Sequence, residues 1–354
     1  MTSGNPSRRV TIQDVAKEAQ VSVSAVSKVL RDAYGVSPQM RSKVTAAIDK
    51  LGYRPQAGAR AMRGRSFTIG VMLTELASPF QQQIADGVTD EVEPGPYQEI
   101  LITGGLTAER QQRAVEALVD RQVDGVIVIA PVMETAWLER LAGTLPTVVV
   151  ARHGGGLNFD TVVDDDHGGA RLVVDHLVRL GHRHIAHTSH PSGDLRPPAV
   201  LSHSARCDGY VAAMQRHGLE PDVIETAYSE EGGYQAAAKA LARAEPPTAV
   251  FAGADIAALG VLRAAEERGL RVPQDLTVTG YDNIYLSTIG RISLTTVDQS
   301  GDLTGQMSAR LLLDRLGGRT QPVHYVVAPR LITRSTSAAP ARVSAGRQAH
   351  RRSH

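Results

Sequence analysis

Apolar residues in the N-terminal part of the chain recur at the spacing of short helices. One stripe falls at i, i+3, i+4 and i+7, directly after Thr11, a residue type that favours the N-cap of a helix. Its members are Ile12, Val15, Ala16 and Ala19. After a short turn, Ser22 is placed to cap a second helix over 23–31, and Ser37-Pro38 to start a third over 38–51. Two short helices joined by a brief turn predict a helix-turn-helix.

The second predicted helix has small, polar and cationic side chains on its outer face. These outward residues are Val23, Ser24, Ser27 and Lys28. Such a surface suits a helix that enters the DNA major groove, where base edges offer hydrogen-bonding groups and thymine methyls. An ordinary solvated helix surface has a similar composition, so each residue alone is ambiguous and only the whole arrangement is specific.

The segment 55–65 is basic and too short to form a core of its own. Pro55 suits the first turn of a helix, since that turn needs no N–H from it, whereas Gly58 weakens a helix standing alone. The segment favours a helix that folds only against DNA, with Met62 available as a wedge for a minor-groove base step. A flexible linker is the alternative.

Beyond residue 66, buried apolar runs of strand length alternate with helical stretches. Strands are expected at 67–74, 99–103, 125–130, 146–151, 161–166, 184–188, 222–227, 248–252 and 275–282. This alternation predicts parallel sheets covered by helices, and its restart after the loop 152–160 indicates two α/β halves of about five or six strands each. Two such lobes place a ligand cleft between them, at the carboxyl ends of their strands.

Charge is segregated along the chain. The 354 residues carry a formal net charge of +1, and 42% of them are apolar, which suits two or three domains with sizeable cores. Residues 1–65 hold 12 Lys and Arg against four acids, and residues 338–354 hold four Arg and no acid, so the remainder is acidic. A basic head on an acidic body points to a polyanion that meets the head alone. A solvated charged surface is the alternative.

Cysteine content and the chain's ends bear on its location. Cys207 is the only cysteine, which leaves no intrachain disulfide and no cysteine-based zinc site. Met1–Arg9 is polar and no apolar core of a secretory signal follows, nor does any apolar run reach membrane-spanning length. We therefore expect a cytoplasmic protein without membrane contact, and a disordered basic tail over 338–354.

The motifs of the head and body together carry a family resemblance. The head matches in "VTIQDVAKEAQVS", "VSKVL", "VSPQMRSKV", "LGYRP" and "ARAMR". The body matches in "LGHRHIAH", "RCDGY", "GLRVPQDLTVTGYDN" and "LTTVDQ". On these segments nearly the whole chain resembles the lactose-repressor (LacI/GalR) family of bacterial transcription regulators. The resemblance implies an α/β fold, with a helix-turn-helix head and a bilobed periplasmic-binding-protein-like body of two doubly wound parallel sheets.

The resemblance also implies domain boundaries. The head then spans 1–54, the hinge helix or linker 55–65 and the effector-binding and dimerisation domain 66–337, before the tail 338–354. The chain crosses between the lobes three times. Lobe 1 is expected from about 66–160 and 291–320, and lobe 2 from about 161–290 and 321–337.

DNA-contacting residues follow from the same resemblance, which places base reading at Val23, Ser24 and Lys28 and a minor-groove wedge at Met62. The predicted major-groove set is Thr11, Ser22, Val23, Ser24, Ser27 and Lys28. The predicted hinge set is Gln56, Ala59, Arg60, Met62 and Arg63. Lys28, Gln56 and Met62 stand where Arg, Asn and Leu are usual in the family. Because Lys lacks the bidentate fork of Arg, the resemblance defines the binding mode better than the operator sequence.

Polar, charged and aromatic residues near strand ends are the candidates for the effector site. The predicted set is Phe80, Asp165, Arg206, Asp255, Asp282 and Gln299. In the family, the positions of Arg206 and Asp282 hydrogen-bond polar atoms of the effector, and Phe80 is placed to stack on a ligand ring. A surface salt bridge for Arg206, a turn cap for Asp282 and a plain core role for Phe80 are the alternatives. Ala254 stands where many relatives carry Asn, so one polar contact is expected to be missing.

Motifs for catalysis or cofactor binding are not found in the sequence. The histidines of "GHRHIAHTSH" alternate between the faces of a strand and lack the spacing of a compact metal site. The sequence contains no GxxxxGK[ST] phosphate loop and no GxSxG nucleophile elbow. We therefore expect no enzyme, no metal and no cofactor.

The function implied by the resemblance is that of a transcriptional regulator, most often a repressor, that binds a near-palindromic double-stranded DNA operator as a homodimer. A small-molecule effector in the cleft, commonly a sugar or derivative in the family, changes the angle between the lobes and with it the affinity for DNA. Two alternatives stay open. One is an effector-independent or protein-modulated regulator of the same fold, which Ala254 mildly favours. The other is a sugar-binding transport protein, which the basic head and the missing export signal disfavour.

Overall fold

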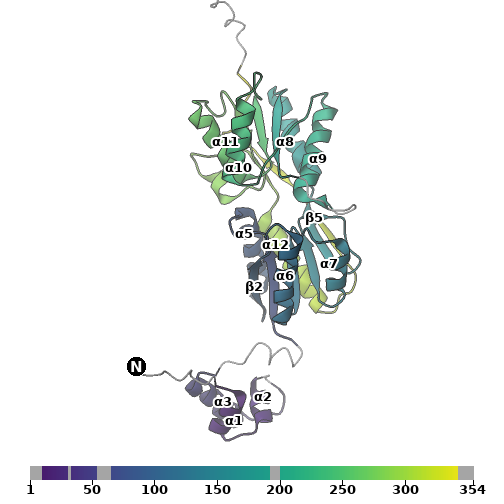
Figure 1. Ribbon diagram of the computed structural model, residues 1–354. Helices are drawn as coiled ribbons and strands as arrows, with labels where there is room; N and C mark the ends of the chain where they lie inside the picture. The colour runs from purple at the N-terminus through teal and green to yellow at the C-terminus, as the bar shows by residue number, and fades with distance from the viewer. Residues whose placement is uncertain (1–9, 31–32, 54–64, 192–199, 342–354) are drawn as a thin grey trace, which may run out of the picture. The chain divides into compact units, whose positions relative to one another are not determined.

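The computed structural model describes residues 10–30, 33–53, 65–191 and 200–341 (Figure 1). By its internal contacts the chain divides into two compact units, Met1–Ser66 and Phe67–His354. The predicted hinge residues Gln56, Ala59, Arg60, Met62 and Arg63 lie outside the described residues.

The head consists of three helices, α1 (Ile12–Ala19), α2 (Val23–Leu30) and α3 (Pro38–Leu51). Their apolar stripes meet in one small core. The fully buried members of that core are Val15, Val26 and Val44. The three helices predicted from the apolar spacing are thus confirmed.

Side-chain caps set the helix boundaries in the head. Thr11 and Asp14 form a capping box at α1, in which the Thr11 hydroxyl accepts from the Asp14 amide and the Asp14 carboxylate accepts from the Thr11 amide at 2.8 Å. The Ser22 hydroxyl accepts from the Ala25 amide at 3.1 Å at the start of α2. Each cap satisfies helix N–H groups that have no partner within the helix.

The first lobe of the body is built on a six-stranded parallel sheet in the order β13-β6-β4-β3-β1-β2. The strands are β1 (Thr68–Leu73), β2 (Gln98–Thr103), β3 (Gly125–Ile129), β4 (Thr147–Val150), β6 (Asp160–Asp164) and β13 (His324–Val327). One face packs on α5 (Pro79–Val92) and α12 (Gly301–Leu316), and the other on α6 (Ala108–Asp120) and α7 (Thr135–Ala142) (Figure 1). Successive strand residues point to opposite faces, and because helices cover both faces, the inner strands are apolar on both.

The second lobe contains a parallel sheet in the order β11-β10-β7-β9. The strands are β7 (Ile185–Ser189), β9 (Asp222–Glu225), β10 (Ala249–Ala252) and β11 (Thr277–Thr279). The helices α8 (Asp166–Leu180) and α9 (Ser202–Arg216) pack on one face, and α10 (Glu230–Leu241) and α11 (Asp255–Glu267) on the other. Among the described residues this sheet has four strands, fewer than the five or six expected.

The strands β6 and β13 lie in the first lobe, although the sequence placed them in the second. β6 pairs with β13 from Thr161↔His324 to Asp164↔Val327, and β6 also pairs with β4, so both strands belong to the first sheet. The prediction that the second lobe starts near Thr161 and takes in all of 321–337 is therefore wrong. A buried apolar strand shows the same residue pattern in either sheet, so its partners cannot be read from its own sequence.

Short segments join the two lobes. The chain passes between them where β6 gives way to α8, where β12 (Thr296–Asp298) gives way to α12, and where β13 gives way to β14 (Arg330–Ile332). β12 and β14 pair antiparallel beside these crossings. A second antiparallel pair, β5 (Arg152–His153) with β8 (Val200–Leu201), joins the segment after β4 to the start of α9.

The start of the predicted tail is ordered against the second lobe. The Ala338 carbonyl accepts from the Thr277 hydroxyl at 3.0 Å and contacts the His182 ring nitrogen at 2.9 Å. Residues 338–341 are therefore part of the folded body, contrary to the expected boundary of a disordered tail at 338. Residues 342–354 lie outside the described residues.

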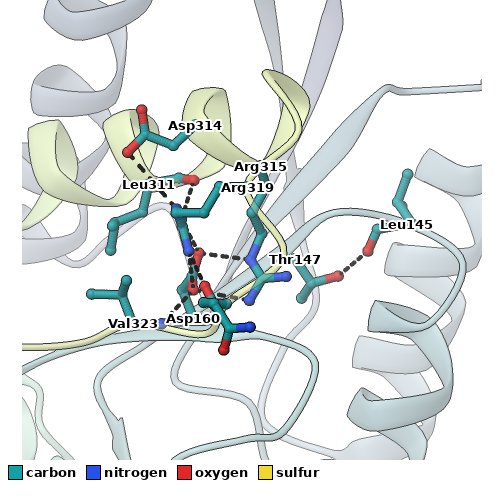
Figure 2. A network of polar contacts seen from close by, with 9 residues as sticks. Leu145, Thr147, Asp160, Leu311, Asp314, Arg315, Arg319 and Val323 are labelled. Carbon is teal, nitrogen blue, oxygen red and sulfur yellow. Dashed lines mark hydrogen bonds and ion pairs between the residues drawn. The ribbon is translucent and has the colours of Figure 1, made fainter.

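A buried ionic cluster joins α12 to the entry of β6 (Figure 2). The Asp160 carboxylate is fully buried and accepts from Arg315 Nε at 2.7 Å and from Arg319 Nη2 at 2.7 Å. The Val323 amide, just before β13, also donates to it at 2.7 Å. One carboxylate thus ties together a helix and the starts of two neighbouring strands of the first lobe.

Candidate functional site

The outer face of α2 is the candidate DNA surface of the head. Val23 is 42% exposed, and Ser24 and Lys28 are exposed beside it, while Val26 and Val29 point into the core. The helix turns Val26 and Val29 inward and presents a hydroxyl, an amine and the aliphatic side chain of Val23 outward. Contact of this face with bases stays a prediction.

The other predicted major-groove residues have structural roles in addition. Thr11 is exposed and caps α1, and Ser22 caps α2 while its hydroxyl lies 2.8 Å from that of Ser24. Ser27 is half-buried. Of the six residues in the predicted set, all but Ser27 are exposed, and Val23 and Lys28 have no capping role.

A cavity of about 320 Å³ lies between the two lobes of the body. Four of the six predicted effector residues line it: Phe80, Arg206, Asp282 and Gln299. They come from the first turn of α5, from α9, from the end of β11 and from the end of β12. Strand ends and helix starts from both lobes therefore converge on one hollow, as expected for doubly wound sheets.

Arg206 is the buried cation of this cavity and is 4% exposed. Its Nη2 and Nε lie 2.9 and 3.2 Å from Asp166 Oδ1, its Nη1 donates to the Gly253 carbonyl, and its guanidinium lies 3.6 Å from the Tyr281 ring centroid. Burial opposes the charge of Arg206, but the attraction of Asp166, with smaller contributions from neighbouring groups such as Tyr281, together outweighs burial and holds the pKa of Arg206 well above its ordinary value. Arg206 is therefore positioned by an ion pair and a cation–π contact before any ligand arrives.

Asp282 is the second charged residue in the cavity wall. Its backbone lies at φ 122°, and its amide donates to the Val297 carbonyl at 2.9 Å. Gln299 Nε2 donates to its carboxylate at 2.5 Å, and the residue is 8% exposed. Burial raises the pKa of Asp282 well above its ordinary value. A positive φ is strained for a residue with a side chain, and the surrounding contacts hold it there.

Asp165 and Asp255 do not line the cavity, which corrects their expected place. Asp165 is an exposed N-cap whose side chain accepts from the Gly168 amide at 2.9 Å. Asp255 is fully buried and accepts from the Ile284 amide at 3.0 Å and the Ser287 and Thr296 hydroxyls at 2.5 Å. Burial is the main cause that raises the pKa of Asp255 to about 6. Both carboxylates serve the protein's own backbone and hydroxyls.

Sequence reasoning missed Asp166, the partner of Arg206. It is fully buried and also lies 2.8 Å from His153 Nε2. The run "DDD" at 164–166 indicated carboxylates at a strand end, but the sequence analysis chose Asp165, whose side chain is exposed. Asp164, the first of the three, accepts from the Tyr281 hydroxyl at 2.7 Å.

An aromatic cluster in the cavity wall was missed as well. His190, His203 and Tyr228 pack together, with ring centroids 5.1, 5.8 and 6.3 Å apart, and all three line the cavity. Burial lowers the pKa of His203 to about 4, so its ring is neutral at pH 7. His190 ends the "GHRHIAHTSH" segment, whose histidines were all interpreted as structural.

The described residues contain no cluster of His, Cys, Asp or Glu that could hold a metal ion. No helix within them is long and apolar enough to cross a membrane.

Comparison with known proteins decides the family. The model of the bacterial regulatory proteins of the lacI family matches residues 11–56, and a periplasmic binding protein-like domain matches residues 174–337. Catabolite control protein A of Priestia megaterium is 34% identical over 328 residues, covering 91% of this chain and 97% of that protein. The chain belongs to the LacI family. The HTH-type transcriptional repressor PurR of Proteus mirabilis is 32% identical, covering 93% and 97%.

Solved LacI-family structures share the fold of nearly the whole chain. A lac repressor dimer bound to operator and the anti-inducer ONPF is 29% identical, with a TM-score of 0.79, covering 94% of this chain and 100% of that one. The transcriptional regulator CelR in complex with cellobiose is 30% identical, with a TM-score of 0.68, covering 93% and 100%. The protein is thus a LacI-family transcriptional regulator with the head and body of its relatives.

Proposed function

We propose that this regulator is a cytoplasmic repressor that binds a near-palindromic operator as a homodimer and is switched by a small molecule in the interlobe cavity. The observation that carries the proposal is the similarity of nearly the whole chain to a lac repressor dimer bound to operator. In this chain, Lys28 on α2 is exposed and can reach DNA. Two-fold symmetry of such a dimer matches two half-sites related by the same symmetry.

The cavity residues lie next to the crossings between the lobes, which supports a switch. Asp166, the partner of Arg206, is the first residue of α8 after the crossing from β6. Asp282 hydrogen-bonds Val297 in β12, just before the crossing to α12. A ligand that binds Arg206 or Asp282 would therefore change the contacts of the segments that connect the lobes, and with them the angle between the lobes. Effector and operator affinities are then reciprocally coupled, whichever sign the coupling has.

The hinge set is proposed to complete the DNA contact. Arg60 and Arg63 neutralise phosphates, and Met62 wedges into a base step of the minor groove. This part of the proposal rests on the sequence and the family, since the residues lie outside the described ones.

The alternatives differ in what the cavity does. A protein-modulated regulator would need no open, partly polar hollow, and the lining by Arg206, Asp282 and Gln299 favours a small molecule. Ala254 also lines the cavity, so the expected loss of one polar contact at that position falls in the proposed site. The head matched over residues 11–56 argues against a transport protein.

Lys28→Ala is expected to weaken operator binding by about 1–3 kcal/mol and to relax the preference at one base pair of each half-site. The reason is that an amine on the outer face of α2 donates to base acceptors in the major groove. Binding is measured by fluorescence anisotropy on the operator, on single-base variants of it and on random DNA.

Lys50→Ala is the matched control for Lys28→Ala. It removes the same charge from an exposed lysine whose amine pairs with Glu18 at 2.7 Å instead of lying on α2. Its effect should be the same on operator and random DNA. An equal loss for Lys28→Ala on both DNAs would contradict base reading by Lys28.

A further inference from the structure

A groove on the outer surface of the first lobe lies between α6 and α7 (Figure 1). It shares no lining residue with the interlobe cavity, and its volume is about 280 Å³. Its apolar members are Val119 from α6, which is 42% exposed, and Trp137 and Leu141 from α7. A hollow of about 150 Å³ already admits a benzene-sized group, so this groove has room for one branched aliphatic side chain.

An exposed leucine lies beside α7 on a loop with a fixed backbone. Leu157 is 82% exposed. The Glu139 carboxylate of α7 accepts from the Leu157 amide at 2.7 Å, and from the backbone and side-chain amides of Asn158 at 3.1 and 2.8 Å. Phe159, the next residue, is buried in the first-lobe core. Leu157 is therefore held in place before any partner arrives, which lowers the entropy cost of a contact.

The groove and the leucine lie on opposite sides of α7. Successive helix residues turn by about 100°, so Glu139 points about 200° away from both Trp137 and Leu141. Leu157 is held at its backbone by Glu139, and its high exposure shows that it does not enter the groove of its own chain. The groove can receive this leucine only from another molecule.

The rim of the groove carries charges of both signs. Glu116 and Asp120 lie on α6 and Arg140 on α7, and all three are exposed. Two surfaces that carry one sign of charge repel each other, whereas a surface with both signs can meet a second copy of itself. The charges of the rim are thus compatible with self-association.

We propose that this face of the first lobe binds the same face of a second copy of the chain, with Leu157 of each copy inserted into the groove of the other. A two-fold axis between Leu157 and the groove makes both insertions at once, and the contact then closes. Apolar surface of two leucines and two grooves leaves the water. The contact joins two operator-binding homodimers into a tetramer. The inference goes beyond the proposed function, since one operator needs only one homodimer.

Sedimentation velocity of the full chain tests the proposal. The wild type should change from particles of two chains to particles of four as its concentration rises from about 1 to about 100 μM, because a small interface of this kind is weak. Leu157→Ser should weaken this step about hundredfold, about tenfold for each of the two leucines. Particles of two chains at every concentration, or particles of four that persist in Leu157→Ser, would overturn the proposal.

Changes in the groove provide matched controls. Val119→Ser should also weaken the step, whereas Val223→Ser, which removes a valine of similar exposure (39%) from β9 in the second lobe, should not. Arg140→Glu should weaken it as well, since both rims then become acidic. Leu157→Ser combined with Val119→Ser should cost less than the sum of the two, because the side chains contact each other. Strictly additive losses, or an equal loss in Val223→Ser, would contradict insertion of the leucine into the groove.

Trp137 reports the contact from inside the groove. It is the one tryptophan of the chain. Its fluorescence emission should move to shorter wavelength as the protein concentration rises, because the leucine of the second copy displaces water from the indole ring. Leu157→Ser should abolish this shift and leave the emission at low concentration unchanged, since Leu157 lies across α7 from Trp137 in its own chain. A shift that persists in Leu157→Ser would contradict the proposal.

Operator binding separates this contact from that of the homodimer. Leu157→Ser should bind a single operator as the wild type does and lose only the tighter binding to a duplex that carries two operators. If Leu157→Ser instead gives single chains that bind one operator weakly, the face belongs to the homodimer and the tetramer is refuted. Particles of four chains that bind no operator would refute the proposed regulator and leave the contact standing.

Discussion

Asp160→Asn is expected to lower the free energy of unfolding of the body by about 3–5 kcal/mol. The carboxylate is fully buried and is the shared partner of Arg315 and Arg319, which are 9% and 23% exposed at their side chains. Without its charge, Arg315 stays nearly buried beside a neutral amide whose N–H groups repel its own. The substitution also weakens the link between α12, β6 and β13 (Figure 2).

The effect of Asp160→Asn depends on pH with a defined sign. Burial opposes ionisation of Asp160, but the hydrogen bonds from Arg319 and Arg315 outweigh burial and hold its pKa below the ordinary 3.8. A carboxyl whose pKa is depressed in the folded state stabilises the fold above its unfolded pKa and loses that contribution as the pH falls through the folded pKa. The difference between wild type and Asp160→Asn should therefore be full at pH 7 and shrink below pH 3.8.

Urea unfolding followed by the fluorescence of Trp137, the one tryptophan of the chain and part of α7 in the first lobe, measures this loss. Asp275→Asn is the control, since its ion pair with Arg271 lies at the exposed surface and should contribute little. If Asp160→Asn shifts the unfolding midpoint no more than Asp275→Asn does, the cluster is not a determinant of the first lobe's stability.

Arg206→Ala is expected to destabilise the second lobe by about 3–5 kcal/mol, in addition to any loss of effector binding. From the sequence alone, Arg206→Ala is expected to remove an effector contact and to leave operator binding unchanged. The structure adds that Asp166, fully buried, would lose its ion-pair partner. The ring of Tyr281 would also lose the guanidinium that lies over it.

A paired substitution tests this explanation. The double variant Arg206→Met with Asp166→Asn removes both charges, and its stability should return most of the way to wild type, because a buried ion pair replaced as a whole costs little. Circular dichroism during urea unfolding measures all three proteins. If the double variant is as unstable as Arg206→Ala, the ion pair does not explain the loss. Asp282→Asn, which keeps the Arg206–Asp166 pair, is the cleaner variant for loss of effector response.

Local signals predicted the head well. Thr11, Ser22 and Ser37 each stand immediately before an apolar stripe, and cap and stripe together define a helix within a few residues. The lobe boundaries could not be predicted in the same way. The sequence of β6 is that of a buried strand in either sheet, and only its pairing with β4 and β13 shows that it belongs to the first lobe.

The candidate site shows the same limit. Phe80, Arg206, Asp282 and Gln299 were found because strand ends and helix starts of doubly wound sheets converge on a cleft. The prediction chose Asp165, whereas its neighbour Asp166 is the carboxylate that contacts Arg206. Which residue of the "DDD" run points inward depends on where α8 begins, and the sequence does not define that start to one residue. Tyr228 and His203 carry no local signal, because their contact depends on the loop after β9 reaching the first turn of α9 in the folded lobe.

Selection of operator DNA by the full chain is the decisive measurement for ligand-switched operator binding by a homodimer. The full-length protein is mixed with a pool of random duplexes, and the bound DNA is sequenced and footprinted. We expect a near-palindromic site with a two-fold symmetric footprint, occupied by two chains, and an affinity that shifts when a cavity ligand is added. Enrichment of no sequence, or of a single asymmetric half-site bound by one chain, would contradict it.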